Sequence, residues 1–322
     1  MKQFSFIVTG GAGFIGRNII DALNARGHDD ILVVDALNNP TKKANLASVC
    51  YAEFMDKDDF RDALLAGAIA PVKTVFHLGA CSSTMQMDVD FLNDNNVLYT
   101  QQVCTWCRDN DVRFIYASSA ATYGDGEHGY VDDETNIQEL NPLNPYGQSK
   151  QDFDLWAREH GLFDHIVGLK YFNVYGPFEA HKGDMRSVVN KAYGWIQDTG
   201  ELSLFKSYRP DFADGEQNRD FIYVKDAVAV TLFFHDHPEV SGLFNCGTGE
   251  ARTWIDLGRA IFAAMELEPK IKIIEMPDAL RDRYQYHTQA DATKLRECGF
   301  TQPFMSIEEG VDDYVRNYLA ND

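Results

Sequence analysis

The stretch "IVTGGAGFIG", residues 7 to 16, decides the fold of this chain. It runs from an apolar strand pattern through Gly10, Gly13 and Gly16 into a helical pattern, and Asp35 follows 19 residues after Gly16 at the end of "ILVVD". Glycines at such a turn let the backbone approach a pyrophosphate, and the helix start offers free N–H groups to the anion. The aspartate can bond an adenosine ribose. The pattern predicts a dinucleotide site, because a purely structural glycine turn does not require that aspartate.

Short apolar runs alternate with helical patterns through the first half of the chain. Strands are expected at 4–10, 31–35, 74–79, 112–119 and 165–176, and helices at 14–26, 58–67, 90–109 and 145–160. Continuous apolar strands joined by crossover helices imply a parallel sheet that is covered on both faces. We therefore expect an α/β fold built on a doubly wound parallel sheet of the Rossmann type.

The alternation loosens in the second half of the chain. Residues 177–220 indicate loop and helix over a ligand site rather than more sheet, whereas "FIYVKDAVAV" and "GLFNCGTG" indicate a return to the sheet. The tail, 251–322, holds two helical patterns around "IKIIEMP". We expect a dinucleotide-binding domain of residues 1–176 plus about 219–250. A smaller C-terminal substrate-binding lobe would hold about 177–218 plus 251–322.

Composition excludes several classes of partner. The 322 residues include 29 basic and 49 acidic ones, a net charge of -20, which repels nucleic acid and anionic membranes. The chain shows neither a signal-peptide layout nor an apolar run of roughly 20 residues, so we expect a cytoplasmic protein without a membrane segment. The nine histidines lack metal-ligand spacing, and Cys104 and Cys107 fall in an amphipathic helical pattern, so no metal site is expected.

A second constellation concerns proton transfer. "ASSAATYG" at 117–124 ends a strand with Ser119, and "PYGQSK" places Tyr146 and Lys150 four residues apart, which is the same face of a helix. An adjacent ammonium and an oxidised nicotinamide favour the phenolate, so we expect a lowered pKa for Tyr146. The phenolate could then take a hydroxyl proton while hydride leaves to the cofactor, with the Ser119 hydroxyl holding the same oxygen.

Further motifs are spaced along almost the whole chain: "HLGACSST", "LNDNN", "YASSAATYG", "YFNVYGP", "HKG", "RDFIYVKD", "FNCGTG" and "RYQYHTQAD". They resemble the extended short-chain dehydrogenase/reductases, in the branch that modifies nucleotide sugars, and within it the ADP-heptose 6-epimerases. The resemblance implies an isomerase that uses NADP, with NAD possible, and an ADP-heptose substrate. It implies transient oxidation at C6 and hydride return to the opposite face, in lipopolysaccharide inner-core biosynthesis. It also implies a homo-oligomer, since the family forms homopentamers.

The resemblance assigns roles position by position. Ser119, Tyr146 and Lys150 match the family triad, and Lys182 matches a second catalytic base. Cofactor contacts would come from Gly10, Gly13, Phe14, Ile15, Gly16, Asp35, Ala36, Lys42, Lys57, Leu78, Gly79, Ala80, Cys81, Ser82, Asn95, Tyr146, Lys150, Val174 and Lys182. Substrate contacts would come from Ser119, Asn173, Asp184, Lys191, Phe205, Lys206, Ser207, Tyr208, Arg219 and Tyr284. The chain departs from the family pattern at Ala36, Leu78, Asp184 and in a longer "FKSYRPDFADGEQ" loop.

Several alternatives stay open on the residues alone. Asp35 argues for NAD because it repels a 2′-phosphate, whereas Lys42 and Lys57 could neutralise one. A UDP-hexose 4-epimerase would show the same triad and glycine turn, and a non-catalytic dinucleotide sensor could use the same fold. His181 beside Lys182 is typical of loop surface. Arg219 could bind a diphosphate or pair with its neighbour Asp220.

Overall fold

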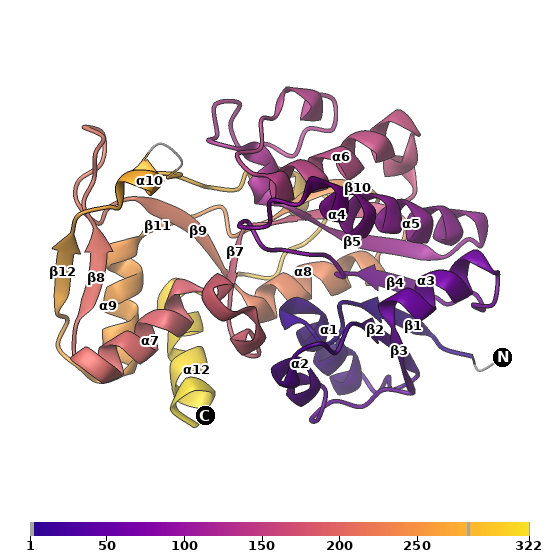
Figure 1. The fold of residues 1–322 in the computed structure, drawn as a ribbon, viewed down its shortest axis with the longest axis horizontal. Coiled ribbons are helices and arrows are strands. Elements are labelled where there is room, and N and C mark those ends of the chain that lie inside the picture. The colour runs from indigo at the N-terminus through magenta and orange to yellow at the C-terminus, as the bar shows by residue number, and fades with distance from the viewer. Residues whose placement is uncertain (1–2, 282–283, 322) are drawn as a thin grey trace.

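A parallel sheet forms the larger part of the computed structural model, which describes residues 3–281 and 284–321 (Figure 1). Within these ranges it has seven strands, in the order β3-β2-β1-β4-β5-β6-β10. Their bounds are β1 (Phe6–Thr9), β2 (Ile31–Asp35), β3 (Glu53–Asp56), β4 (Thr74–His77), β5 (Arg113–Ser119), β6 (Val167–Tyr171) and β10 (Gly242–Cys246). All neighbouring strands run parallel. The predicted doubly wound fold is confirmed, with its switch point between β1 and β4, where such sheets bind ligands.

Helices cover both faces of this sheet, as its buried strands require. In β1, Phe6 and Val8 pack into one apolar cluster and Ile7 into another on the opposite face. The long helices are α1 (Phe14–Ala25), α3 (Lys57–Leu65), α5 (Tyr99–Asp109), α6 (Pro145–Glu159) and α8 (Val224–Asp236). Helices α1 and α8 contribute to the cluster of Phe6 and Val8, whereas α3, α5 and α6 contribute to the cluster of Ile7. Every residue of β1, β2, β4, β6 and β10 is buried between these layers.

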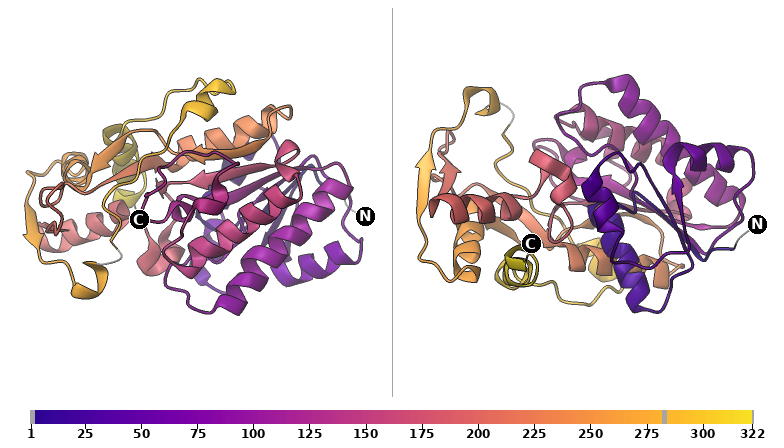
Figure 2. Two further views of the ribbon diagram at one scale, coloured as in Figure 1. Left: turned by 90° about the horizontal axis from the view of Figure 1, so that it is seen from above. Right: turned by 60° about the horizontal axis from the view of Figure 1, so that its bottom comes forward.

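A smaller region extends away from the main sheet, toward the left in Figure 1 and in both views of Figure 2. In the part of the chain described, one sheet joins β7 (Asn173–Tyr175), β9 (Asn218–Tyr223) and β11 (Ala251–Thr253), and another joins β8 (Leu202–Phe205) and β12 (Ile271–Ile274). The helices of this region are α7 (Val188–Thr199), α9 (Trp254–Ala264) and α12 (Ile307–Asn317). The predicted division into a domain and a lobe stays a prediction.

Shorter elements connect these parts. The α-helical ones are α2 (Pro40–Asn45), α4 (Val89–Leu92), α10 (Asp278–Arg281) and α11 (Thr293–Glu297). The π-helix η1 (Asn93–Leu98) joins α4 to α5, and 3₁₀ turns form η2 (Ala120–Tyr123), η3 (Ile137–Glu139), η4 (Leu162–Asp164), η5 (Ala180–Met185) and η6 (Leu319–Asn321). No helix of the described ranges combines the length and the apolar character that crossing a bilayer requires.

Three predictions about the second half of the chain are wrong. The strand expected at 165–176 divides at Phe172, after which β7 pairs with β9 in the smaller sheet. The "FIYV" run therefore joins that smaller sheet and not the main one, because β10 already occupies the edge beside β6. The segment 177–220 also contains β8 and the start of β9, where only loop and helix were expected.

Candidate active site

A cavity of about 700 Å³ lies at the carboxyl ends of the main sheet. Strand-end residues Thr9, Asp35, Ser119 and Tyr171 reach it from β1, β2, β5 and β6. The predicted site residues that line it are Gly10, Gly13, Phe14, Ile15, Gly16, Asp35, Ala36, Lys42, Lys57, Leu78, Gly79, Ala80, Cys81, Ser82, Asn95, Ser119, Tyr146, Lys150, Asn173, Val174 and Lys182. The predicted cofactor and catalytic positions thus share one cavity.

The glycine turn has no room for side chains. Gly10 has φ +65°, and a Cβ there would lie 2.7 Å from Leu78 and Gly79 backbone atoms. A Cβ on Gly16 would collide with the carbonyl of Gly10. Helix α1 begins directly after Gly13, and no described side chain caps its first turn. Uncapped N–H groups at a cavity wall fit a pyrophosphate.

Asp35 organises the far end of the cavity. One carboxylate oxygen, Oδ2, accepts the backbone N–H of Ala12 in the glycine turn at 2.9 Å. The other, Oδ1, accepts the Ala36 N–H at 2.7 Å and the Lys42 ammonium at 2.7 Å. Lys57 lines the same cavity. Asp35 therefore holds the turn in place while Lys42 compensates its charge.

The Tyr-Lys pair projects into the cavity from α6. The side chain of Asn144 caps this helix by accepting a backbone N–H of the first turn at 2.8 Å. Tyr146 thus lies in the first turn and hydrogen-bonds the Ser119 hydroxyl from the end of β5. One turn further, the Lys150 ammonium donates to the carbonyl of Ala117 at 2.8 Å. The structure therefore brings the three predicted triad residues together.

Burial dominates the electrostatics of this pair. It raises the pKa of Tyr146, and the hydrogen bond from Ser119 opposes the rise only in part. It lowers the pKa of Lys150 to about 8, against the charge of Asp154. In the chain alone, burial disfavours the phenolate more than its neighbours favour it. The predicted fall in the pKa of Tyr146 includes the charge of an oxidised nicotinamide and stays a prediction.

Lys182 lies in the same cavity, on the turn η5. Its ammonium is 5.4 Å from the centre of the Phe14 ring, and Gly183 after it takes φ +55°. Burial lowers the pKa of Lys182, while the charge of Glu179 opposes this. Glu179 is fully buried and accepts the Ser187 hydroxyl at 2.6 Å. Lys182 is thus a partly dehydrated amine beside the glycine turn and not a solvated surface charge.

His181, expected at the loop surface, is partly exposed on the turn η5 and also lines the cavity. Its Nδ1 lies 3.3 Å from the side-chain nitrogen of Asn45, and burial lowers its pKa to about 4. The signal that could have placed it is its position in "HKG", directly before Lys182.

Most predicted substrate residues do not line this cavity. Among the described residues they are Asp184, Lys191, Phe205, Lys206, Ser207, Tyr208, Arg219 and Tyr284. Their substrate contacts stay predictions. Arg283, which begins the "RYQYHTQAD" motif, lies outside the described residues.

Arg219 is buried one side chain away from the cavity. Its guanidinium lies 5.6 Å from the ring of Trp254, which lines the cavity, and 5.4 Å from the ring of Tyr284. It donates to the backbone carbonyls of Asn218, at 2.7 Å, and of Gln285. Its neighbour Asp220 instead accepts backbone N–H groups of Thr248, Gly249 and Ala290. The suggested pairing of Arg219 with Asp220 is therefore wrong.

Sequence patterns missed another part of the cavity wall. These residues come from segments far apart in the chain: Asn38, Ser83, Phe91, Met185, Arg186, Ser187, Val188, Val189, Phe221, Trp254 and Leu257. No shared spacing marks them, because they come from loops and from α4, η5, α7, β9 and α9, which only the tertiary fold brings together.

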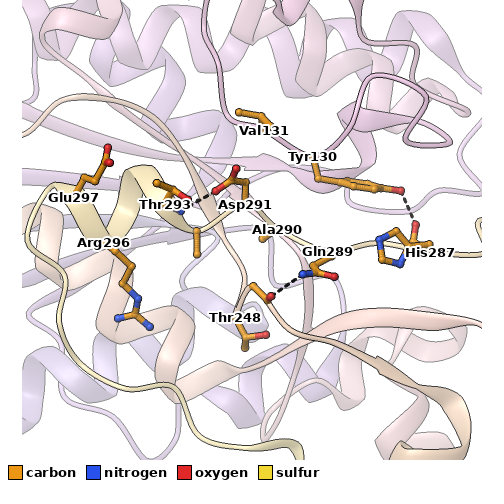
Figure 3. Close-up of a pocket in the computed structure, with 12 residues that line it drawn as sticks. Tyr130, Val131, Thr248, His287, Gln289, Ala290, Asp291, Thr293, Arg296 and Glu297 are labelled. Atoms are coloured by element: carbon orange, nitrogen blue, oxygen red, sulfur yellow. Dashed lines mark hydrogen bonds between the residues drawn. The ribbon is translucent and has the colours of Figure 1, made fainter.

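A separate and more open pocket lies outside this cavity (Figure 3). There Tyr130 donates to the backbone carbonyl of His287, and Gln289 donates to that of Gly249 at 2.9 Å. None of the predicted site residues, all of which the structure describes, lines this pocket. Within the described ranges, no group of three or more His, Cys, Asp or Glu side chains could hold a metal ion. The cavity at the strand ends is therefore the candidate active site.

Comparison with known proteins agrees with this geometry. The NAD dependent epimerase/dehydratase family matches residues 6–247, and the chain belongs to that family. Within it, the chain is 52% identical over 316 residues to the ADP-L-glycero-D-manno-heptose-6-epimerase of Nitratidesulfovibrio vulgaris, covering 98% of each protein. It is 46% identical over 326 residues to the enzyme of that name from Fusobacterium nucleatum, again covering 98% of each.

A solved structure supports the same relation. The crystal structure of Helicobacter pylori ADP-L-glycero-D-manno-heptose-6-epimerase matches with a TM-score of 0.83 at 26% identity, covering 99% of this chain and 97% of that one. The resemblance inferred from the motifs is therefore confirmed, and with it the expected enzyme class, an epimerase.

Proposed function

We propose that this chain interconverts ADP-D-glycero-D-manno-heptose and ADP-L-glycero-D-manno-heptose with NADP, as a cytoplasmic homo-oligomer that serves lipopolysaccharide inner-core biosynthesis. The observation that carries the proposal is one cavity lined by two proton-transfer groups from separate elements, Tyr146 on α6 and Lys182 on η5. Relatives that align over 98% of the chain carry the corresponding name.

Inversion at C6 of the heptose needs an oxidation, because that carbon carries no acidic C–H. A bound nicotinamide dinucleotide supplies the hydride acceptor and donor. The remaining task is to take a proton from one hydroxyl and to deliver one to the same oxygen after the side chain has turned. Proton transfer needs about 2.6–3.2 Å between heavy atoms, so one fixed group cannot serve both oxygen positions.

The residues of this chain can divide that task. Tyr146 serves the oxygen in one orientation, with Ser119 hydrogen-bonded to the phenol and Lys150 anchored on Ala117 behind it. Lys182 serves the oxygen in the other orientation. Burial lowers the pKa of this lysine, which makes its neutral form accessible closer to neutral pH.

The residues present fit the dinucleotide. The glycine turn would hold the pyrophosphate, since a Cβ at Gly10 would meet backbone there. The Asp35 carboxylate would face the adenosine ribose. The ion pair of Lys42 with Asp35, 2.7 Å long, reduces the repulsion of a 2′-phosphate, and this favours NADP over NAD.

One experiment tests the proposed reaction. The purified protein, with no added cofactor, is offered ADP-D-glycero-D-manno-heptose in one sample and a UDP-hexose in another, and the products are followed by NMR. We expect the second heptose epimer to appear only in the first sample. Epimerisation of the UDP-hexose alone would refute the proposed substrate and favour a UDP-hexose 4-epimerase. Turnover of neither sugar would favour a non-catalytic dinucleotide sensor.

A further inference from the structure

A fully buried ion pair lies directly behind the Tyr-Lys pair. The Lys170 ammonium on β6 is 2.9 Å from the Asp154 carboxylate on α6, and both side chains are 0% exposed. The proton transfers described above make no use of either charge. Taking two charges out of water costs several kcal/mol for each ion, and apolar residues of similar size are often as stable in such places. Stability alone therefore does not account for the pair.

Each member of the pair has further hydrogen-bond partners. The Asp154 carboxylate accepts the hydroxyls of Tyr116 and Ser118, each at 2.7 Å. The Lys170 ammonium also donates to the hydroxyl of Thr122 at 2.6 Å. These neutral partners come from β5 and from the turn η2 that follows it. The network therefore ties α6, β5 and β6 together beneath the cavity.

Its position relates it to the triad in two ways. Tyr146, Lys150 and Asp154 follow one another at intervals of four residues, so they lie on one face of α6, with the carboxylate one turn below the lysine. The network also brackets Ser119, because Ser118 precedes it and the Thr122 hydroxyl donates to its carbonyl at 2.8 Å. The network of the ion pair therefore adjoins the triad both along α6, below Lys150, and along β5, around Ser119.

We propose that Asp154 is a positioning residue that keeps the Lys150 ammonium protonated and in place. Lys170 compensates the charge of this buried carboxylate. The part of this inference that concerns turnover rests on the proposed function. The part that concerns the charge of Lys150 does not depend on which reaction the protein catalyses.

The groups that face Lys150 are few. Asp154 on the same helix favours the charged ammonium, as does Cys81 from the loop after β4, and burial opposes both. His77 on β4 faces the same lysine, whose charge helps to depress the pKa of that imidazole to about 3. A neutral His77 adds no repulsion. The Asp154 carboxylate is therefore the main charge that supports the ammonium.

The direction of the effect follows from these signs. The pKa of Lys150 is about 8, so the protonated form dominates at neutral pH and is lost as the pH rises through that value. Removing the Asp154 carboxylate removes a contribution that raises this pKa, so the midpoint moves to lower pH. An opposite charge within about 4–6 Å of a titratable group shifts its pKa by about one unit or more.

The experiment compares Asp154→Asn with Asp152→Asn. Asp152 lies on the same helix but is exposed, and it accepts the side chain of Gln148 at 2.7 Å. Lysine side chains carrying ¹³C at Cε are titrated by NMR in the full-length protein with its bound nucleotide, and a Lys150→Arg variant assigns the signal. We expect the Lys150 midpoint to fall by about one pH unit or more in Asp154→Asn and to stay in place in Asp152→Asn.

A second variant keeps the test decisive if Asp154→Asn does not fold with Lys170 left uncompensated. The double variant Asp154→Asn/Lys170→Met removes both charges, and a smaller fall of the midpoint is expected there, because the repulsion by the Lys170 ammonium is removed together with the attraction by the carboxylate. The alkaline limb of kcat should move with it in both variants. A lower kcat at every pH with an unmoved NMR midpoint would overturn the inference, because that is what a merely structural role produces. Failure of the wild type to epimerise would refute the proposed function, whereas the NMR midpoints would still decide this inference.

Discussion

Replacing Lys182 with methionine tests the division of labour between the two proton-transfer groups. Methionine keeps most of the length and apolar stem of lysine and removes only the amine. In the structure the Lys182 ammonium makes no hydrogen bond or ion pair with any described residue, although it lies 5.4 Å from the Phe14 ring. The substitution therefore leaves no hydrogen-bonding group unpaired among the described residues, so we expect a change in unfolding free energy within about 1 kcal/mol.

The expected effect on turnover is much larger than the effect on stability. A positioned acid or base contributes about 10²–10⁴-fold, which corresponds to about 2.7–5.4 kcal/mol of activation free energy at 1.36 kcal/mol per decade. Lys182→Met should therefore lose epimerisation by about that factor while melting near the wild-type temperature. Tyr146→Phe should lose it by at least as much, because the phenol also bonds Ser119.

The assay follows both halves of the reaction. Epimerisation is measured by NMR, and reduction of the bound nucleotide is measured by its near-ultraviolet absorbance after adding each purified epimer. Under two-base chemistry, each variant should still oxidise one epimer, and the two variants should differ in which one. Lys272→Met, at an exposed position on β12, serves as the control with the same chemical change. Normal epimerisation by Lys182→Met, with Tyr146→Phe inactive, would refute the reasoning.

Three further outcomes follow from the same structure. Turnover in heavy water should leave deuterium absent from C6 of the product, because hydride returns internally, and substantial incorporation seen by NMR would indicate proton abstraction instead. Lys42→Ala should weaken NADP binding about tenfold or more and NAD binding much less, since it removes the cation paired with Asp35. Calorimetry on protein stripped of nucleotide measures the affinity for each dinucleotide. Equal losses of affinity would contradict the proposed preference for NADP. Light scattering should give a homo-oligomer, as the family resemblance implies, and a monomer at micromolar concentration would count against it.

The cofactor end was predictable because its signals are local. Gly10, Gly13 and Gly16 predict a turn without room for side chains, and Asp35 follows at the end of the next strand. In a parallel sheet, consecutive strand ends meet at one edge, so residues named at those ends necessarily converge. Tyr146 and Lys150 converge for a similar reason, because a helical repeat places them on one face.

The substrate end was harder to predict because no local rule governs it. Phe221 and Trp254 reach the cavity, whereas Phe205 and Tyr208 do not line it. The difference depends on β9 leaving the main sheet to pair with β7, and this depends on β10 taking the free edge beside β6. Such competition between strands for one edge involves residues far apart in the sequence, and no periodicity records it.

The sequence by itself determined the doubly wound sheet, the dinucleotide turn, the Tyr-Lys pair and the resemblance to nucleotide-sugar epimerases. Only the tertiary structure decided that Lys182 lies in the cavity of Tyr146, that Arg219 lies behind Trp254, and that Asp154 pairs with Lys170 beneath the triad. It also decided the direction of both pKa shifts, since burial raises the pKa of Tyr146 and lowers that of Lys150. The physical reason is common to these cases: strand, turn and helix patterns are set by neighbours along the chain, whereas burial and the proximity of charges are set by every segment that packs around a group.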